Sequence, residues 1–224
     1  MLTRRAFLGA TSAGIMLPST SHARRGKAEE ALIHRAMVGI NPSRFLDAHV
    51  HVVGVGHGNT GCAVHPSMMD MWGHPFQWIR FRVYAQASGV KDLTQIDAHY
   101  LRVLRERTEN LPTGGRSLLM AFDQVHDEQG RPLPDHTIFH VPNEYMFKAV
   151  DSAPHFLPCA SVHPYRKDAV EALHAAADRG AIAVKWLPNA MWIDPASAQC
   201  DSAYRVMAER GLTLISHGGE EQAV

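Results

Sequence analysis

Two histidines separated by one residue are the first feature of the sequence that could do chemistry. His49 and His51 lie in the apolar run RFLDAHVHVV, residues 44–53, and Asp47 precedes them by two residues. Because successive side chains of a β-strand point to opposite faces, these three polar side chains would share one face. Two imidazoles placed so near a strand end can both reach one cation. The spacing therefore predicts a metal half-site, in which Asp47 would orient one of the ligands.

Ionisable residues also close three later apolar runs. His163 ends FLPCASVH, Lys185 lies near the end of AIAVKWL, and His217 ends LTLISH before a glycine pair. In α/β barrels, chemistry sits at the rim formed by the carboxyl ends of the strands. The pattern therefore favours a shared site in which these groups meet the histidine pair.

The elements that must position these residues alternate along the chain. Apolar runs typical of strands alternate with segments of helical periodicity, and two of the helices end in Arg-Gly directly before a strand. The strands are expected over residues 45–53, 116–125, 156–163, 181–187 and 212–217, and the helices over 93–110, 143–151, 166–180 and 200–211. Such alternation indicates right-handed βαβ units and a parallel sheet, either doubly wound or a barrel.

The motifs DAHVH, AVKWLP and LISHGGEE together resemble the amidohydrolase superfamily of metal-dependent hydrolases. The branch concerned is the amidohydrolase-related one, which also contains non-oxidative decarboxylases, and the resemblance covers most of residues 44–224. It implies a (β/α)8 TIM-type barrel in which His49, His51 and His217 bind a divalent metal. Lys185 falls where binuclear members carry a carboxylated lysine that bridges two metals.

The resemblance also implies a function. One or two divalent ions, zinc being the expected metal, would activate water to open an amide, ester or lactone bond. Lys185 and His217 are the expected catalytic residues, and His163 and Trp186 are expected to contact the substrate. Three alternatives stay open: a decarboxylase of the same superfamily, a non-catalytic metal- or ligand-binding barrel, and a Lys185 that reaches solvent or a substrate carboxylate.

The length bears on the barrel as well. A (β/α)8 barrel typically needs about 250 residues, and this sequence reaches only about the fifth strand within its 224 residues. The histidine after the sixth strand and the aspartate after the eighth, both typical of the family, have no counterpart here. We therefore expect the sequence to be part of a longer protein.

The first 23 residues have the layout of an export signal. Arg4 and Arg5 precede Phe7-Leu8 and an apolar stretch, and small residues follow, a pattern that resembles a twin-arginine signal. An uncleaved N-terminal anchor is the alternative. The expected organisation is a signal over 1–23, a lead-in over 24–43 and the barrel part over 44–224, in a periplasmic or secreted protein.

Composition limits the partners. With 22 basic and 22 acidic residues the formal charge is zero, so nothing favours nucleic acid. We expect a small-molecule substrate and no stable membrane association after signal cleavage, and a homo-oligomer stays open. Three cysteines match no disulfide framework or zinc motif, so unpaired core or loop residues are expected.

Two further patterns admit competing interpretations. GHGNTG, residues 56–61, matches the dinucleotide fingerprint but is not followed by a clean βαβ unit, so an active-site loop is favoured. The stretch from Met68 to Trp78 is rich in methionine and aromatic residues. It could line an apolar pocket or cap the barrel.

Overall fold

The computed structural model describes residues 27–41, 44–109 and 115–219. The chain divides into two compact units, residues 1–38 and 39–224. In the first, the described part holds helix α2 (Lys27–Ala36). The export signal expected over 1–23 lies outside the described residues. None of the helices within the described ranges has the length and apolar character needed to cross a membrane.

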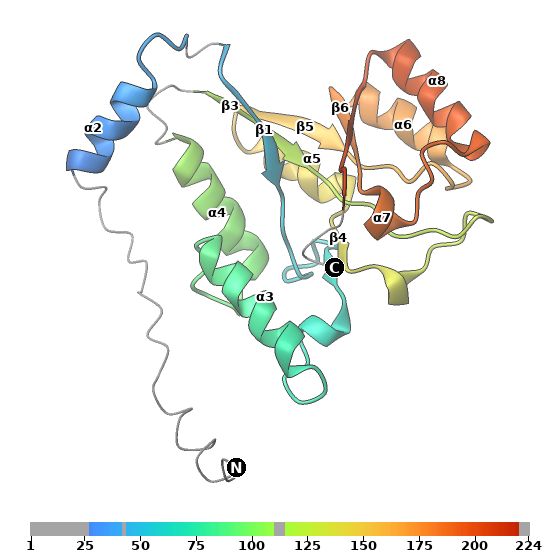
Figure 1. Cartoon of the computed structure of the whole chain (residues 1–224), viewed down its shortest axis with the longest axis horizontal. Helices are drawn as coiled ribbons and strands as arrows, with labels where there is room; N and C mark the ends of the chain where they lie inside the picture. Colours follow the sequence, from blue (N-terminus) through green and yellow to red (C-terminus); the bar gives the residue numbers. More distant parts are fainter. Residues whose placement is uncertain (1–26, 42–43, 110–114, 220–224) are drawn as a thin grey trace, which may run out of the picture. The chain divides into compact units, whose positions relative to one another are not determined.

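A five-stranded parallel sheet forms the centre of the second unit. Its strands, in spatial order, are β1 (Leu46–His51), β3 (Arg116–Met120), β5 (Phe156–Ala160), β6 (Ala183–Trp186) and β7 (Thr213–Ser216). Every neighbouring pair is parallel, and the spatial order follows the chain order. A doubly wound sheet would reverse its order at a switch point, and these strands show no reversal. The sheet is therefore a curved half-barrel, consistent with a partial α/β barrel (Figure 1).

Helices fill the connections between the strands. They are α3 (Pro75–Ala87), α4 (Ile96–Glu109), α5 (Asn143–Asp151), α6 (Ala169–Asp178), the short α7 (Pro188–Met191) and α8 (Asp201–Arg210). The four helices expected from periodicity are confirmed as α4, α5, α6 and α8. Short 3-10 turns are η2 (Pro66–Met68), η3 (Pro134–His136) and η4 (Ala198–Cys200), and β2 (Ala63–Val64) pairs antiparallel with β4 (Phe139–His140).

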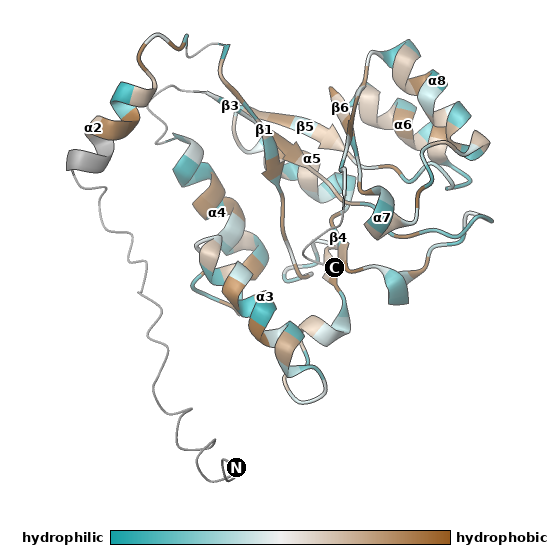
Figure 2. Cartoon of the chain, viewed as in Figure 1, coloured by the Kyte–Doolittle hydropathy of each residue, from teal (hydrophilic) through white to brown (hydrophobic). Residues whose placement is uncertain are grey.

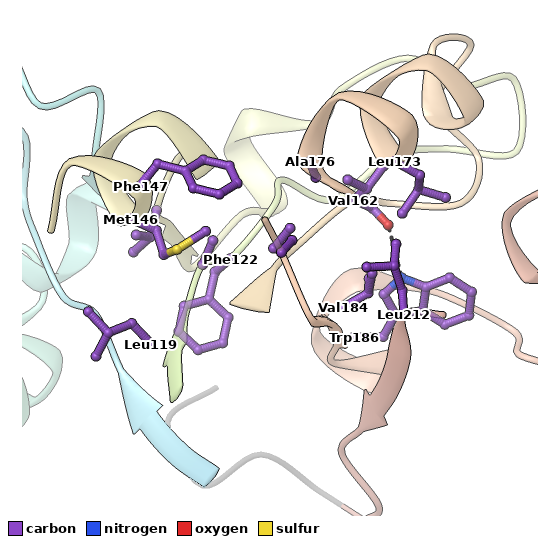
Figure 3. Close-up of a cluster of buried hydrophobic side chains, with 14 of the residues drawn as sticks. Leu119, Phe122, Met146, Phe147, Val162, Leu173, Ala176, Val184, Trp186 and Leu212 are labelled. Carbon is purple, nitrogen blue, oxygen red and sulfur yellow. Dashed lines mark hydrogen bonds between the residues drawn. The ribbon is translucent and has the colours of Figure 1, made fainter. Parts of the chain in front are cut away.

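The main core lies between the sheet and its covering helices. Leu119 and Val184 of the sheet belong to one buried cluster with Met146 of α5 and Leu173 of α6 (Figure 3). α4 and α8 carry both hydrophobic and hydrophilic bands, as expected for helices that cover a sheet on one side (Figure 2). Cys62, Cys159 and Cys200 are buried and free, which confirms the expectation of unpaired cysteines.

The opposite face of the sheet carries a second, smaller cluster. Its buried members are Leu118, Met120, Cys159 and Ala183. Leu118 and Met120 flank Leu119 on β3, so the alternation of side chains separates this cluster from the main core. Lys185 follows Ala183 by two residues on β6 and therefore belongs to the same inner face.

Strand β1 departs from the expected pattern of one covered apolar face. Val52, just beyond the strand, is fully buried, but Leu46 is 37% exposed and Ala48 is also exposed. The register with β3 shifts between Asp47 and Val50, which places an extra residue in β1. Such a bulge bends the strand and re-aims the side chains after it. Within the described residues β1 also pairs on one side only, so its first half is left uncovered.

The methionine- and aromatic-rich stretch is only partly buried. Met68 is buried together with Phe81 and Ala85 of α3, and these residues pack on the start of α4. Trp72 and Phe76, in contrast, are 89% and 83% exposed. α3 therefore covers α4 with one side, and Trp72 and Phe76 lie at the surface. The apolar pocket that this stretch could line stays a prediction.

Candidate functional site

The two histidines of β1 point to the same place. The Nε2 atoms of His49 and His51 lie 2.9 Å apart, and the ring centroids are separated by 4.7 Å. In this contact one imidazole donates a hydrogen bond and the other accepts it. The predicted convergence of the two rings on one point is thus present. Asp47 is placed differently from the other two, since its Oδ1 accepts from the backbone N–H of His49 at 3.2 Å.

Lys185 and His217 share the neighbourhood of this pair. Burial, and after it repulsion from His49, lowers the pKa of His51 to about 4. Repulsion from Lys185 and His217 lowers this pKa by smaller amounts. Such repulsion acts only over short distances, so both residues lie near His51. The side chain of Lys185 is buried, with 1% of its surface exposed. The groups that the sequence placed at the ends of β1, β6 and β7 therefore gather at one end of the sheet.

The donor set fits a divalent ion in type and nearly in spacing. Two imidazole nitrogens bound to one tetrahedral zinc at about 2.0–2.1 Å lie about 3.3 Å apart. The observed 2.9 Å between the Nε2 atoms requires only a small opening of the pair. In the described part of the chain, no group of three or more His, Cys, Asp or Glu side chains is already close enough to hold a metal ion.

His51 is held from two sides. Its ring stacks on Phe122, with centroids 5.0 Å apart and an angle of 11° between the planes. Its backbone carbonyl accepts a hydrogen bond from the hydroxyl of Tyr100 on α4. Burial raises the pKa of that hydroxyl to about 12, so it is a donor at neutral pH. These contacts orient the imidazole of His51. Neither Phe122 nor Tyr100 lies in a recognisable sequence motif, so sequence reasoning did not identify them.

The glycine-rich loop after β1 is anchored by an internal carboxylate. Asp97, in the first turn of α4, is fully buried and its Oδ1 accepts from the backbone N–H of Val55 at 2.8 Å. Its carboxylate also accepts from the N–H groups of Gly56 and His57 and from the hydroxyl of Thr60. Two backbone donors of the GHGNTG loop, those of Gly56 and His57, are therefore already bonded to Asp97, which holds the loop in place.

Gly54 is required at the start of this loop. A Cβ atom there would lie 2.4 Å from Oδ2 of Asp97 and 2.7 Å from Sγ of Cys62. Both distances are far shorter than a van der Waals contact. The glycine therefore lets the carboxylate of Asp97 approach the backbone of the loop.

A second polar network joins the ends of β3, β5 and β6. Ser161 donates from its hydroxyl to the carbonyl of Lys185 at 2.9 Å and accepts from the backbone N–H of Asp123 at 3.0 Å. Asp123 is buried and accepts from Nη1 of Arg166 and from the backbone N–H of His163. This network fixes the backbone that carries Lys185. Sequence reasoning missed it, although an aspartate directly after an apolar strand is a usable signal.

His163 and Trp186, the residues expected to contact substrate, are both fully buried. Nε2 of His163 donates to the carbonyl of Met191 at 2.7 Å, and its Nδ1 accepts from the backbone N–H of Tyr165. Nε1 of Trp186 donates to the carbonyl of Val162 at 2.9 Å, in the layer between sheet and helices (Figure 3). The substrate contacts assigned to these two residues stay predictions.

Comparisons with known proteins find no relative, so a functional assignment rests on this geometry. No family model, no curated protein and no solved structure matches the chain.

Proposed function

We propose that the chain carries the metal-binding part of a metal-dependent hydrolase related to the amidohydrolase superfamily, acting on an amide, ester or lactone bond. The observation that carries this proposal is the 2.9 Å contact between Nε2 of His49 and Nε2 of His51 at the end of a half-barrel strand. The sequential order of the five parallel strands supports a (β/α)8 barrel as its scaffold.

His49, His51 and His217 would hold the ion, with Lys185 beside them. A bound divalent ion supplies two things in such a site: it lowers the pKa of a coordinated water toward about 7 and it polarises the scissile carbonyl. Zinc is among the divalent ions that imidazole ligands suit, and it commonly takes the tetrahedral geometry expected here. Lys185 could serve a second ion as a carboxylated lysine, and its burial inside the sheet is consistent with either a ligand or a charge beside one.

Three further residues would hold His51 and Lys185 in position without taking part in the reaction. Phe122 and Tyr100 keep the imidazole of His51 turned toward that of His49. Ser161 bonds to the carbonyl of Lys185 and so helps to fix the backbone from which its side chain extends. Such fixed groups reduce the reorganisation that a reaction requires. We further propose that the substrate is a small molecule met outside the cytoplasm after export.

The ligand assignment is tested by metal analysis of the purified protein. We expect about one zinc ion per chain after reconstitution, or about two where Lys185 is carboxylated. His49→Ala/His51→Ala should lose the bound metal, whereas His34→Ala, which changes an exposed histidine of α2, should keep it. Lys185→Arg keeps the charge but cannot be carboxylated, so it should retain one ion at most. Stoichiometric metal in the double variant would overturn the assignment.

The reaction is tested separately. Zinc-dependent hydrolysis of 4-nitrophenyl acetate by the complete protein that disappears in His217→Ala would support a hydrolase. Retained metal in the complete protein together with no turnover of esters, amides or lactones would instead support a non-catalytic binding barrel.

A further inference from the structure

Trp192 presents an exposed indole at the same end of the sheet as the histidine pair. It directly follows α7, in the connection that leaves β6, the strand of Lys185. The residue is 52% exposed, while its neighbours Met191 and Ile193 are only 2% and 5% exposed. The backbone is therefore anchored on both sides of the tryptophan, and its large apolar side chain is still left in solvent.

The backbone of Trp192 is in an unusual conformation. Its φ of 58° and ψ of 37° place it in the left-handed region, as the residue that caps the end of α7. Glycine or asparagine is the ordinary residue at such a helix end, because a bulky L side chain is strained there. Strained residues of this kind concentrate at binding and catalytic sites. Packing alone gives no reason for a tryptophan at this position, since about half of the surface of the residue is exposed.

Two hydrogen bonds fix α7 to the connections on either side of it. The carbonyl of Met191 accepts from Nε2 of His163, beyond β5, at 2.7 Å. Nδ2 of Asn189 donates to the carbonyl of Gly219, two residues after His217, at 2.6 Å. The support of Trp192 is thus tied directly to the segment that carries one of the proposed metal ligands.

A second exposed ring completes the arrangement. His136 of η3, in the connection between β3 and α5, lies with its ring centroid 4.7 Å from that of Trp192 and at an angle of 44°. Both residues are exposed. Two aromatic rings contributed by two different connections form a surface on which a planar group can stack.

We infer that Trp192, together with His136, binds a planar, aryl group of the substrate next to the proposed metal centre. The substrate class would then be aryl esters, amides or lactones rather than aliphatic ones. The inference rests on the proposed function for the position of the reacting bond, but the aryl-binding surface itself does not depend on it. Trp192 would determine which substrates bind and would take no part in the reaction.

Binding of benzamide to the purified chain tests the inference without requiring turnover. Benzamide is planar, and cyclohexanecarboxamide is a saturated control of similar size. We expect calorimetry or ligand-observed NMR to show benzamide bound more tightly than the control, by about fivefold. Trp192→Gly should remove that preference while keeping or raising the thermal midpoint, because glycine relieves the left-handed strain. Trp192→Phe should retain most of it.

Trp72→Gly is the matched control, since Trp72 is the other strongly exposed tryptophan, at 89%. It should leave benzamide binding unchanged. Equal affinity for the planar and saturated amides, or an equal loss in Trp72→Gly, would overturn the inference. Aryl binding that survives loss of metal in the His49→Ala/His51→Ala variant supports it even where the proposed hydrolase function fails. Absence of aryl selectivity in the unmutated protein with full metal content overturns the inference alone.

Discussion

His163, at the end of β5, illustrates how tertiary contacts determine the state of a single residue. It is fully buried, and its two ring nitrogens bond to the carbonyl of Met191 and the backbone N–H of Tyr165. Only the neutral ring with its proton on Nε2 satisfies both contacts. Burial lowers the pKa of His163 to about 4, against smaller raising effects of the hydrogen bond to Met191 and of nearby Asp123. His126 and Arg166, which also face the ring, lower the pKa further.

This residue should make stability depend on pH. The folded pKa of His163, about 4, lies below its unfolded value of about 6.5, so the unfolded chain binds the proton more readily. The stabilisation is fully present above pH ~6.5 and is lost as the pH falls toward 4. We expect His163→Gln, which keeps a donor for Met191, to reduce the loss of unfolding free energy between pH 7 and pH 5 by about 2 kcal/mol. Urea denaturation at both pH values measures it.

The control for this experiment is His34→Gln on α2. It replaces an exposed histidine and should leave the pH dependence of the wild-type protein unchanged. An equally steep loss of stability in His163→Gln and in the wild-type protein would contradict the role given to His163.

At the scale of elements, the first turn of α4 and the loop after β1 form one unit through Asp97. The buried carboxylate accepts three backbone N–H groups, from Val55, Gly56 and His57, and the hydroxyl of Thr60. Asp97 therefore makes four of the hydrogen bonds that hold the loop, and the backbone N–H of Ile96 adds one to Nδ1 of His57. The position of the loop then affects the end of β1, which carries His51.

We expect Asp97→Asn to destabilise the protein by about 2–4 kcal/mol, because one acceptor oxygen becomes a donor amide that faces other donors. Urea denaturation at pH 7 measures the loss. Asp92→Asn is the comparison, since Asp92 accepts from Thr94 at the exposed surface just before the helix and should matter far less. A stability for Asp97→Asn close to that of Asp92→Asn would show that the loop is held by other contacts.

Element types were largely predictable, and their long-range partners were not. Helix periodicity indicated α4, α5, α6 and α8 because one apolar face must be buried against the sheet. The role of Asp97 could not be predicted, since its partner Val55 lies 42 residues earlier in the chain. The bulge in β1 was equally hidden, because register depends on the neighbouring strand and leaves little trace in the residues themselves.

At the scale of the whole second unit, the sheet has two uncovered edges among the described residues. β1 and β7 each pair with one neighbour, and Leu46 and Ala48 of β1 are exposed. Unpaired backbone groups beside apolar side chains are a template for strand association between molecules. The purified chain should therefore associate increasingly with concentration.

Ala48→Lys should reduce this association without lowering the thermal midpoint, because it adds charge to an exposed edge position. Light scattering over a concentration series measures the effect. Ala98→Lys introduces the same charge at an exposed position of α4 and should leave association nearly unchanged. Equal suppression by both variants would point to net charge rather than to the edge of the sheet.

The sequence by itself determined the local chemistry and the type of the five main strands and of helices α4, α5, α6 and α8. The spacing of His49 and His51 already places both imidazoles on one face of a strand, and βαβ alternation already requires a parallel sheet, because both follow from backbone geometry over a few residues. Only the tertiary structure decided the strand order, the burial of His163 and Trp186, and the exposure of Trp192. These features depend on contacts between residues far apart in the chain, and no local pattern encodes such contacts.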